Sequence, residues 1–171
     1  MITTFDKVYE IMKESFPMEE FRGYEEQQNL LFRSNYFLKT EVQNGEVVGF
    51  CAYYVFNDFF YIEHLACTSQ ARGLGIGTRL VKEVILEAKQ YPVILEVEPP
   101  VNAITRRRIE FYKRLGFILN EMPHYQPPLN LTTGIVELRI MSSCQLSEER
   151  LTQYRRILNT EVYGVEENFK L

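Results

Sequence analysis

A glycine-rich segment in the middle of the chain, QARGLGIGTRL at residues 70–80, has the residue types that most directly suggest chemistry. Gly73, Gly75 and Gly77 alternate with aliphatic residues, and Arg72 stands directly before them. Glycine weakens helices and strands, so a cluster this dense indicates a backbone that must turn sharply or approach another group closely. Because an apolar segment precedes these glycines and a helical pattern follows, backbone N–H groups and a helix N-terminus could bind phosphate together.

Two common phosphate-binding patterns do not fit this segment. The nucleotide P-loop requires G-x-x-x-x-G-K-[ST], which the sequence lacks. The dinucleotide fingerprint requires G-x-G-x-x-G in the first βαβ unit, whereas these glycines follow three predicted antiparallel strands. The segment resembles the pyrophosphate loop of the GNAT superfamily, [QR]-x-x-G-x-[GA]. Residues 72–77 match that pattern, and residues 70–75 match it in a second register. The alternative is a surface turn that binds nothing.

A second segment, RIEFYKRLGF at residues 108–117, resembles the GNAT helix that carries a tyrosine four residues before Gly-Phe. The resemblance covers roughly residues 1–142 and implies an acyl-CoA-dependent N-acetyltransferase with acetyl-CoA as donor. It implies cofactor contacts from the strand end, the loop and one asparagine: Leu65, Ala66, Cys67, Arg72, Gly73, Leu74, Gly75, Ile76, Gly77, Thr78 and Asn102. The sequence departs from the family at Thr105 and Arg108, where many members carry asparagine and alanine. Asn102 lies ten residues before Tyr112.

Acyl transfer from a thioester to an amine needs an acid for the leaving thiolate and a base for the ammonium. Tyr112 is the predicted general acid, because a phenol with a pKa near ~10 can protonate a thiolate whose conjugate pKa is near ~8.5. Glu63, on the strand before the loop, and Glu96 and Glu98, on one face of the next strand, are the candidate bases or water anchors. In the family, acids on either strand can serve.

Other chemistries have less support in the sequence. His64 is expected to be a buried, hydrogen-bonded side chain pointing to the face opposite Glu63. With His124 as the other histidine, no metal site is predicted. Cys67 has no histidine placed to activate it, so it is read as a small apolar residue.

The positioning elements follow from the hydrophobic periodicity. The first helix is predicted to end at Pro17, with Thr4 or Asp6 as its cap and one face formed by Phe5, Val8, Ile11 and Met12. Further helices are predicted at residues 23–33, 75–90, 104–115 and 147–159. One line of the helix at 75–90 carries Ile76, Leu80, Val84 and Ala88, and one line of the helix at 104–115 carries Ile104, Arg108, Phe111 and Leu115. Strands are predicted at 36–42, 47–56, 59–67, 93–99, 117–121 and 134–143, with a tight hairpin turn at Asn44-Gly45. The order predicts a GNAT-like α/β fold, a mixed and mostly antiparallel sheet flanked by helices on both faces. We expect one domain, residues 1–171, with a core at 1–142 and a C-terminal helical extension at 143–171.

Composition narrows the function classes. The chain of 171 residues carries a formal charge of −4, which argues against nucleic acid as a partner. Three widely spaced cysteines and the absence of a long apolar run favour a cytoplasmic protein without a membrane partner. The acidic, aromatic segment at residues 16–26 would suit a cationic amine acceptor, either a small molecule or a peptide. A protein N-acetyltransferase, a non-catalytic acyl-CoA sensor and a homodimer remain open.

Overall fold

The computed structural model describes residues 3–129 and 134–171. The chain forms two compact units, which we call the N-terminal unit, up to Val93, and the C-terminal unit, Ile94–Leu171. Among the described residues, no helix is both long enough and apolar enough to span a membrane.

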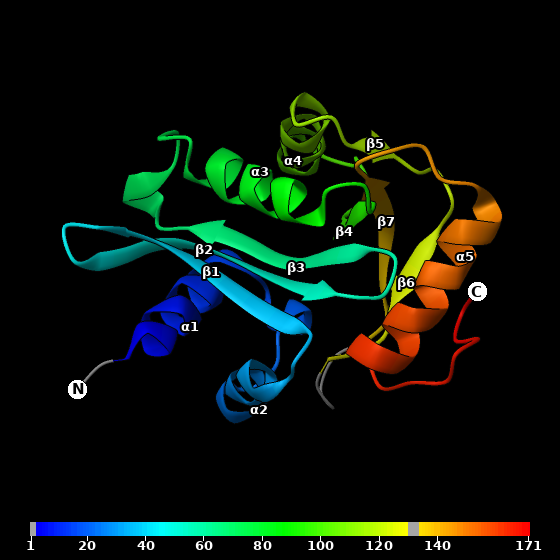
Figure 1. Ribbon diagram of the computed structural model, residues 1–171, viewed down its shortest axis with the longest axis horizontal. Helices are drawn as coiled ribbons and strands as arrows, with labels where there is room; N and C mark the ends of the chain where they lie inside the picture. Colours follow the sequence, from blue (N-terminus) through cyan, green and yellow to red (C-terminus); the bar gives the residue numbers. More distant parts are fainter. Residues whose placement is uncertain (1–2, 130–133) are drawn as a thin grey trace. The chain divides into compact units, whose positions relative to one another are not determined.

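The N-terminal unit is a three-stranded antiparallel sheet with helices on both faces (Figure 1). Strands β1 (Tyr36–Gln43), β2 (Glu46–Val55) and β3 (Phe60–Cys67) pair in chain order. Helix α1 (Thr4–Ser15) covers one face, and α3 (Ile76–Ala88) covers the other. Helix α2 (Tyr24–Asn29) lies between two short 3-10 turns, Met18–Glu20 and Leu30–Phe32.

Periodicity located the buried faces of α1 and α3. The residues predicted to face the core of α1 and of α3 are all buried: Phe5, Val8, Ile11, Met12, Ile76, Leu80, Val84 and Ala88. The hairpin turn between β1 and β2 is also as predicted, since Asn44 and Gly45 have φ angles of 51° and 81°. The cap of α1 is Thr3, which forms a capping box with Asp6, whereas the sequence indicated Thr4 or Asp6.

The C-terminal unit is built around β7 (Val136–Ser142), which pairs antiparallel with β4 (Val93–Val97), β5 (Ile118–Leu119) and β6 (His124–Gln126). Helix α4 (Ala103–Arg114) links β4 to β5. Helix α5 (Glu148–Ile157) continues into a π-helical turn, Leu158–Val162. The sequence prediction missed β6, because its three residues lie between prolines that normally end strands.

The predicted buried line of α4 is wrong. Ile104 is 66% exposed, and the buried residues are Thr105, Ile109 and Tyr112. Few apolar residues mark this helix, so the sequence pattern alone assigned the face poorly.

Candidate functional site

The glycine-rich segment forms the link between β3 and α3. After a 3-10 turn at Ser69–Ala71, Gly73 and Gly75 adopt φ angles of +81° and +76°, a region that costs other residues strain. Gly75 is the residue before α3, and within the described residues no side chain caps the helix there. The first amides of α3 are therefore available to an anion, and the helix dipole favours negative charge at this end.

Close packing between β2 and the first turn of α3 holds this loop against the sheet. A Cβ atom built on Gly49 would lie 2.8 Å from the Ile76 side chain and 3.2 Å from the Cys67 Cβ. Gly49 pairs with Cys67, the last residue of β3. The missing side chain thus lets the first turn of α3 pack directly on the sheet. Gly49 was not among the predicted residues, because a single glycine in a strand gives only a weak signal.

The predicted cofactor contacts in the N-terminal unit lie along one segment, from the end of β3 to the first turn of α3. Leu65, Ala66 and Cys67 end β3 and are partly exposed, and Arg72 through Gly75 are exposed. Ile76 is 1% exposed, so its side chain belongs to the core and only its backbone remains for a ligand. Burial raises the pKa of the Cys67 thiol, and the Arg72 charge opposes this only partly. The thiol is therefore a poor nucleophile at neutral pH.

Glu63 lies at a β-bulge. Ala52 pairs with His64 and Tyr53 with Ile62, so Glu63 has no residue opposite it on β2. A bulge interrupts the alternation of side chains and re-aims them. Glu63 Oε2 consequently lies 3.5 Å from His64 Nδ1. The prediction that these neighbours point to opposite faces is therefore wrong, and the bulge is the reason.

Glu63 is held by a buried ion pair. Its side chain is 3% exposed, and Arg22 Nη1, from the segment before α2, donates to Oε1 over 2.7 Å. Burial alone would raise the pKa of Glu63, but the Arg22 charge and neighbouring His64 outweigh it and lower the pKa to about 2. A carboxylate this acidic attracts cations and orders water, but it removes protons poorly.

His64 is buried and hydrogen-bonded, as predicted. Its Nε2 lies 2.7 Å from the backbone oxygen of Glu20, so Nε2 carries the proton and donates it. Nδ1 then faces Glu63 with no hydrogen-bond partner among the described atoms.

Tyr112 lies at the end of α4 in a complete Schellman motif. The Gly116 N–H donates to the Lys113 carbonyl, the Phe117 N–H donates to the Tyr112 carbonyl, and Gly116 has a φ of +91°. The Phe117 ring packs edge-on against Tyr112, with 5.7 Å between centroids. This motif requires the same Tyr-x-x-x-Gly-Phe spacing that suggested catalysis. The spacing therefore has a structural cause, which neither requires nor excludes a role for the hydroxyl.

Asn102 is the N-cap of α4. Its Oδ1 accepts hydrogen bonds from the backbone N–H groups of Ile104 and Thr105, both over 2.9 Å, and Thr105 Oγ1 accepts from Asn102 N. Helix capping accounts for this asparagine without a ligand. The predicted cofactor contact of Asn102 gains no support from this geometry.

The two glutamates near the end of β4 have different partners. Glu96 is in the strand, its side chain is 7% exposed, and it accepts hydrogen bonds from His124 Nε2 and the Tyr163 hydroxyl. Glu98 lies past the end of β4, is 35% exposed and pairs with Arg108. All three candidate bases are therefore engaged by cations or hydrogen-bond donors.

The sequence prediction missed the partners that hold these carboxylates. Arg22 lies 41 residues from Glu63, and Tyr163 lies 67 residues from Glu96. The only available signal was composition, because Arg22 interrupts the acidic segment at residues 16–26.

Comparison with known proteins agrees with this architecture. The sequence profile of the Acetyltransferase (GNAT) family matches residues 5–117. YjbC from Bacillus subtilis (strain 168) is 32% identical over 112 residues, which are 64% of this chain and 55% of YjbC. The chain therefore spans about half the length of that relative.

Two solved structures share the fold. A GNAT-family protein from Bacteroides thetaiotaomicron is 35% identical, with a TM-score of 0.83 over 92% of this chain and 90% of its own. An aminoglycoside 6′-N-acetyltransferase, described as complexed with coenzyme A, has a TM-score of 0.59 at 17% identity, over 84% of this chain and 93% of its own. The predicted fold class is confirmed, and the chain belongs to the acetyltransferase (GNAT) family.

Proposed function

We propose that the chain is an N-acetyltransferase that moves an acetyl group from acetyl-CoA to a primary amine directly in a ternary complex. The observation that carries this proposal is the pair of left-handed glycines, Gly73 and Gly75, before an α3 N-terminus that no described side chain caps. That arrangement suits a diphosphate, because backbone amides and the helix dipole favour the same anion. The coenzyme A in the aminoglycoside acetyltransferase structure supports the same donor here.

In this proposal the loop residues 72–78 hold the diphosphate, and the backbone at Leu65–Cys67 aligns the pantetheine arm. The amine nitrogen attacks the thioester carbonyl carbon, the carbon–sulfur bond breaks, and Tyr112 gives the leaving thiolate its proton. Alignment of the two substrates supplies much of the rate. Glu63, ionised across the neutral pH range, attracts the cationic amine and orders the water that receives its proton.

A cationic primary amine is the proposed acceptor class. The segment before and within α2 carries Glu19, Glu20, Glu25 and Glu26 as first-turn acids. Met18 beside them is 68% exposed, which offers an apolar contact for the carbon chain of such an amine. The proposal covers small-molecule and peptide amines alike.

A non-catalytic acyl-CoA sensor is the second candidate. It is favoured by one observation, the engagement of all three candidate carboxylates in hydrogen bonds or ion pairs. Release of free thiol from acetyl-CoA in the presence of a panel of primary amines separates the two, because a sensor binds the thioester without consuming it.

The binding loop is tested with matched glycine variants. Gly75 and Gly45 have φ angles of +76° and +81°, and a Cβ added at either meets nothing within 4 Å. Alanine therefore strains both positions similarly, by about 1 kcal/mol, but Gly45 lies in the β1–β2 turn. Calorimetry with acetyl-CoA should show at least tenfold weaker binding for Gly75→Ala and unchanged binding for Gly45→Ala. No heat from the wild-type protein at millimolar acetyl-CoA, or equal effects of both variants, would overturn the proposal.

A further inference from the structure

The C-terminal segment, residues 143–171, converges on Glu96 through a chain of buried hydrogen bonds. His124 Nε2 and the Tyr163 hydroxyl both donate to the Glu96 carboxylate. Behind the imidazole, Arg155 Nε donates to His124 Nδ1 over 3.3 Å. The side chains of Glu96 and His124 are 7% and 2% exposed, and Arg155 is 5% exposed.

The arginine fixes the protonation of the imidazole. An arginine N–H can only donate, so His124 Nδ1 must present a lone pair to it. The imidazole is then neutral and carries its proton on Nε2, where it points at Glu96. A second proton on Nδ1 would displace the Arg155 contact. The geometry therefore holds His124 as a fixed donor to Glu96.

Arg155 is itself anchored from two sides. Its Nη2 donates to the Lys170 carbonyl over 2.7 Å, and its Nη1 lies 3.2 Å from the Met122 sulfur. A buried guanidinium without such contacts would be costly. These contacts, to the backbone at Lys170 and to the segment before β6, hold the guanidinium in one orientation.

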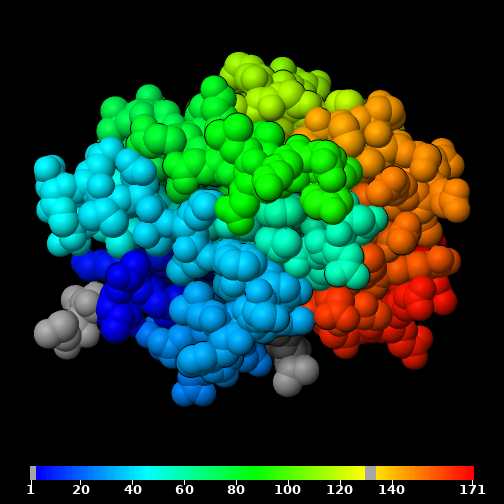
Figure 2. Space-filling model, in the orientation of Figure 1, coloured from blue at the N-terminus to red at the C-terminus, as the bar shows by residue number. Residues whose placement is uncertain are grey.

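The π-helical turn after α5 places Tyr163. Leu158–Val162 form one wide turn that ends directly before this tyrosine, and such turns often accompany functional sites. Asn159, 1% exposed, donates from Nδ2 to the carbonyls of Glu167 and Phe169 and so fastens the tail beneath the turn. In Figure 2 this segment, orange to red, forms one continuous surface.

We infer that Arg155, His124 and Tyr163 are positioning residues that hold Glu96 ionised and in one orientation for the transfer reaction. His124, Arg155 and Tyr163 all lie beyond residues 5–117, the part that matches the family profile. The inference rests on the proposed function and adds Glu96 to Glu63 as a second carboxylate that orders the reacting amine or its water.

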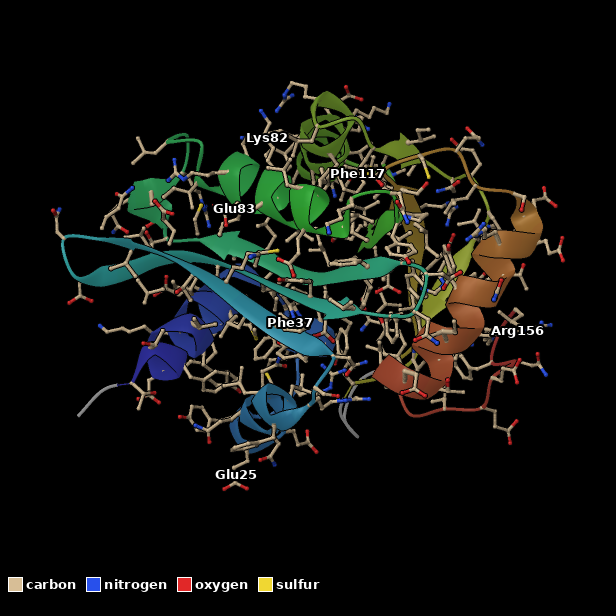
Figure 3. All side chains as sticks on the ribbon, in the orientation of Figure 1. Glu25, Phe37, Lys82, Glu83, Phe117 and Arg156 are labelled. Atoms are coloured by element: carbon tan, nitrogen blue, oxygen red, sulfur yellow. The ribbon has the colours of Figure 1, made fainter. Side chains whose placement is uncertain are left out.

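The first test is kinetic and uses two arginines of the same helix. Arg155→Met should lower kcat about 10- to 100-fold, the range seen when a residue behind a ligating group is lost, with little change in the acetyl-CoA Kd. Arg156→Met is the control, since Arg156 is about half exposed, pairs with Glu167 over 3.6 Å and projects from the outer side of α5 (Figure 3). Equal kcat for Arg155→Met and wild type would overturn the inference.

Substitution of His124 distinguishes a positioning role from a purely structural one. Glutamine can donate to Glu96 and accept from Arg155, whereas leucine can do neither. His124→Gln should therefore recover part of the kcat that His124→Leu loses. Equal loss of kcat in both histidine variants would refute positioning.

A measurement that needs no turnover distinguishes failure of this inference from failure of the proposed function. The chain has two histidines, so the ¹⁵N spectrum of the imidazoles is simple and His124→Gln assigns it. The His124 signals should show the Nε2–H tautomer in wild type, and the Nδ1 signal should shift in Arg155→Met, where Nδ1 loses the arginine's hydrogen bond. If wild type binds acetyl-CoA but never transfers acetyl, the proposed function fails while this spectrum still tests the hydrogen-bond chain. A wild-type His124 that carries its proton on Nδ1 overturns the hydrogen-bond chain itself.

Discussion

Removal of Arg22 should weaken the pH dependence that Glu63 gives to folding. The folded pKa of Glu63 is about 2, against an ordinary value of 4.5. The difference of about 2.5, at about 1.36 kcal/mol each, corresponds to about 3 kcal/mol of stability. Because the folded pKa is depressed, this contribution is fully present above the unfolded value and is lost as pH falls from about 4.5 toward 2.

In Arg22→Met, the Glu63 side chain, which is 3% exposed in wild type, stays buried but loses its counterion. Burial is then opposed only by His64, so the folded pKa of Glu63 rises well above its wild-type value. At mildly acidic pH the folded variant therefore binds more protons than folded wild type, and it lacks the stability that wild type gains from the ionised carboxylate. The variant should be about 3–5 kcal/mol less stable than wild type at pH 7, and this gap should narrow steadily toward pH 4.

Urea unfolding, followed by circular dichroism between pH 4 and 8, measures the difference in stability between wild type and Arg22→Met. Lys7→Met is the control, because Lys7 pairs with Glu46 over 3.4 Å while both side chains are well exposed, and its loss should cost under ~1 kcal/mol. The double variant Arg22→Met/Glu63→Gln, which removes both charges, should recover stability at pH 7. A gap between wild type and Arg22→Met that stays constant with pH would refute the reasoning.

Three further predictions concern the loop, the acid and the α4 cap. Gly49→Ala places a Cβ 2.8 Å from Ile76, so urea unfolding should show a loss of about 1–3 kcal/mol; an unchanged midpoint would contradict the packing argument. Tyr112→Phe should lower thiol release about 10²- to 10⁴-fold at unchanged acetyl-CoA affinity, and an undiminished rate would remove the acid role. Asn102→Ala should cost about 1 kcal/mol of stability, with the acetyl-CoA Kd by calorimetry unchanged; a weaker Kd at equal stability would restore the predicted cofactor contact.

Features that depend on neighbours along the chain could be predicted from the residues alone. The positive φ of Gly73 and Gly75, the Asn44-Gly45 turn and the helix end at Gly116 all follow from local backbone preferences. The buried faces of α1 and α3 follow from helical periodicity, because strongly apolar helices reveal which side they bury.

The contacts between polar side chains, by contrast, became known from the fold. A one-residue bulge at Glu63 placed it beside His64, which period-two alternation excludes. The Arg22 contact and the Arg155–His124–Glu96 chain join residues between 28 and 41 positions apart. Buried polar groups must find partners wherever the fold brings donors and acceptors together. Those pairings depend on strand register and helix docking, which no local pattern encodes.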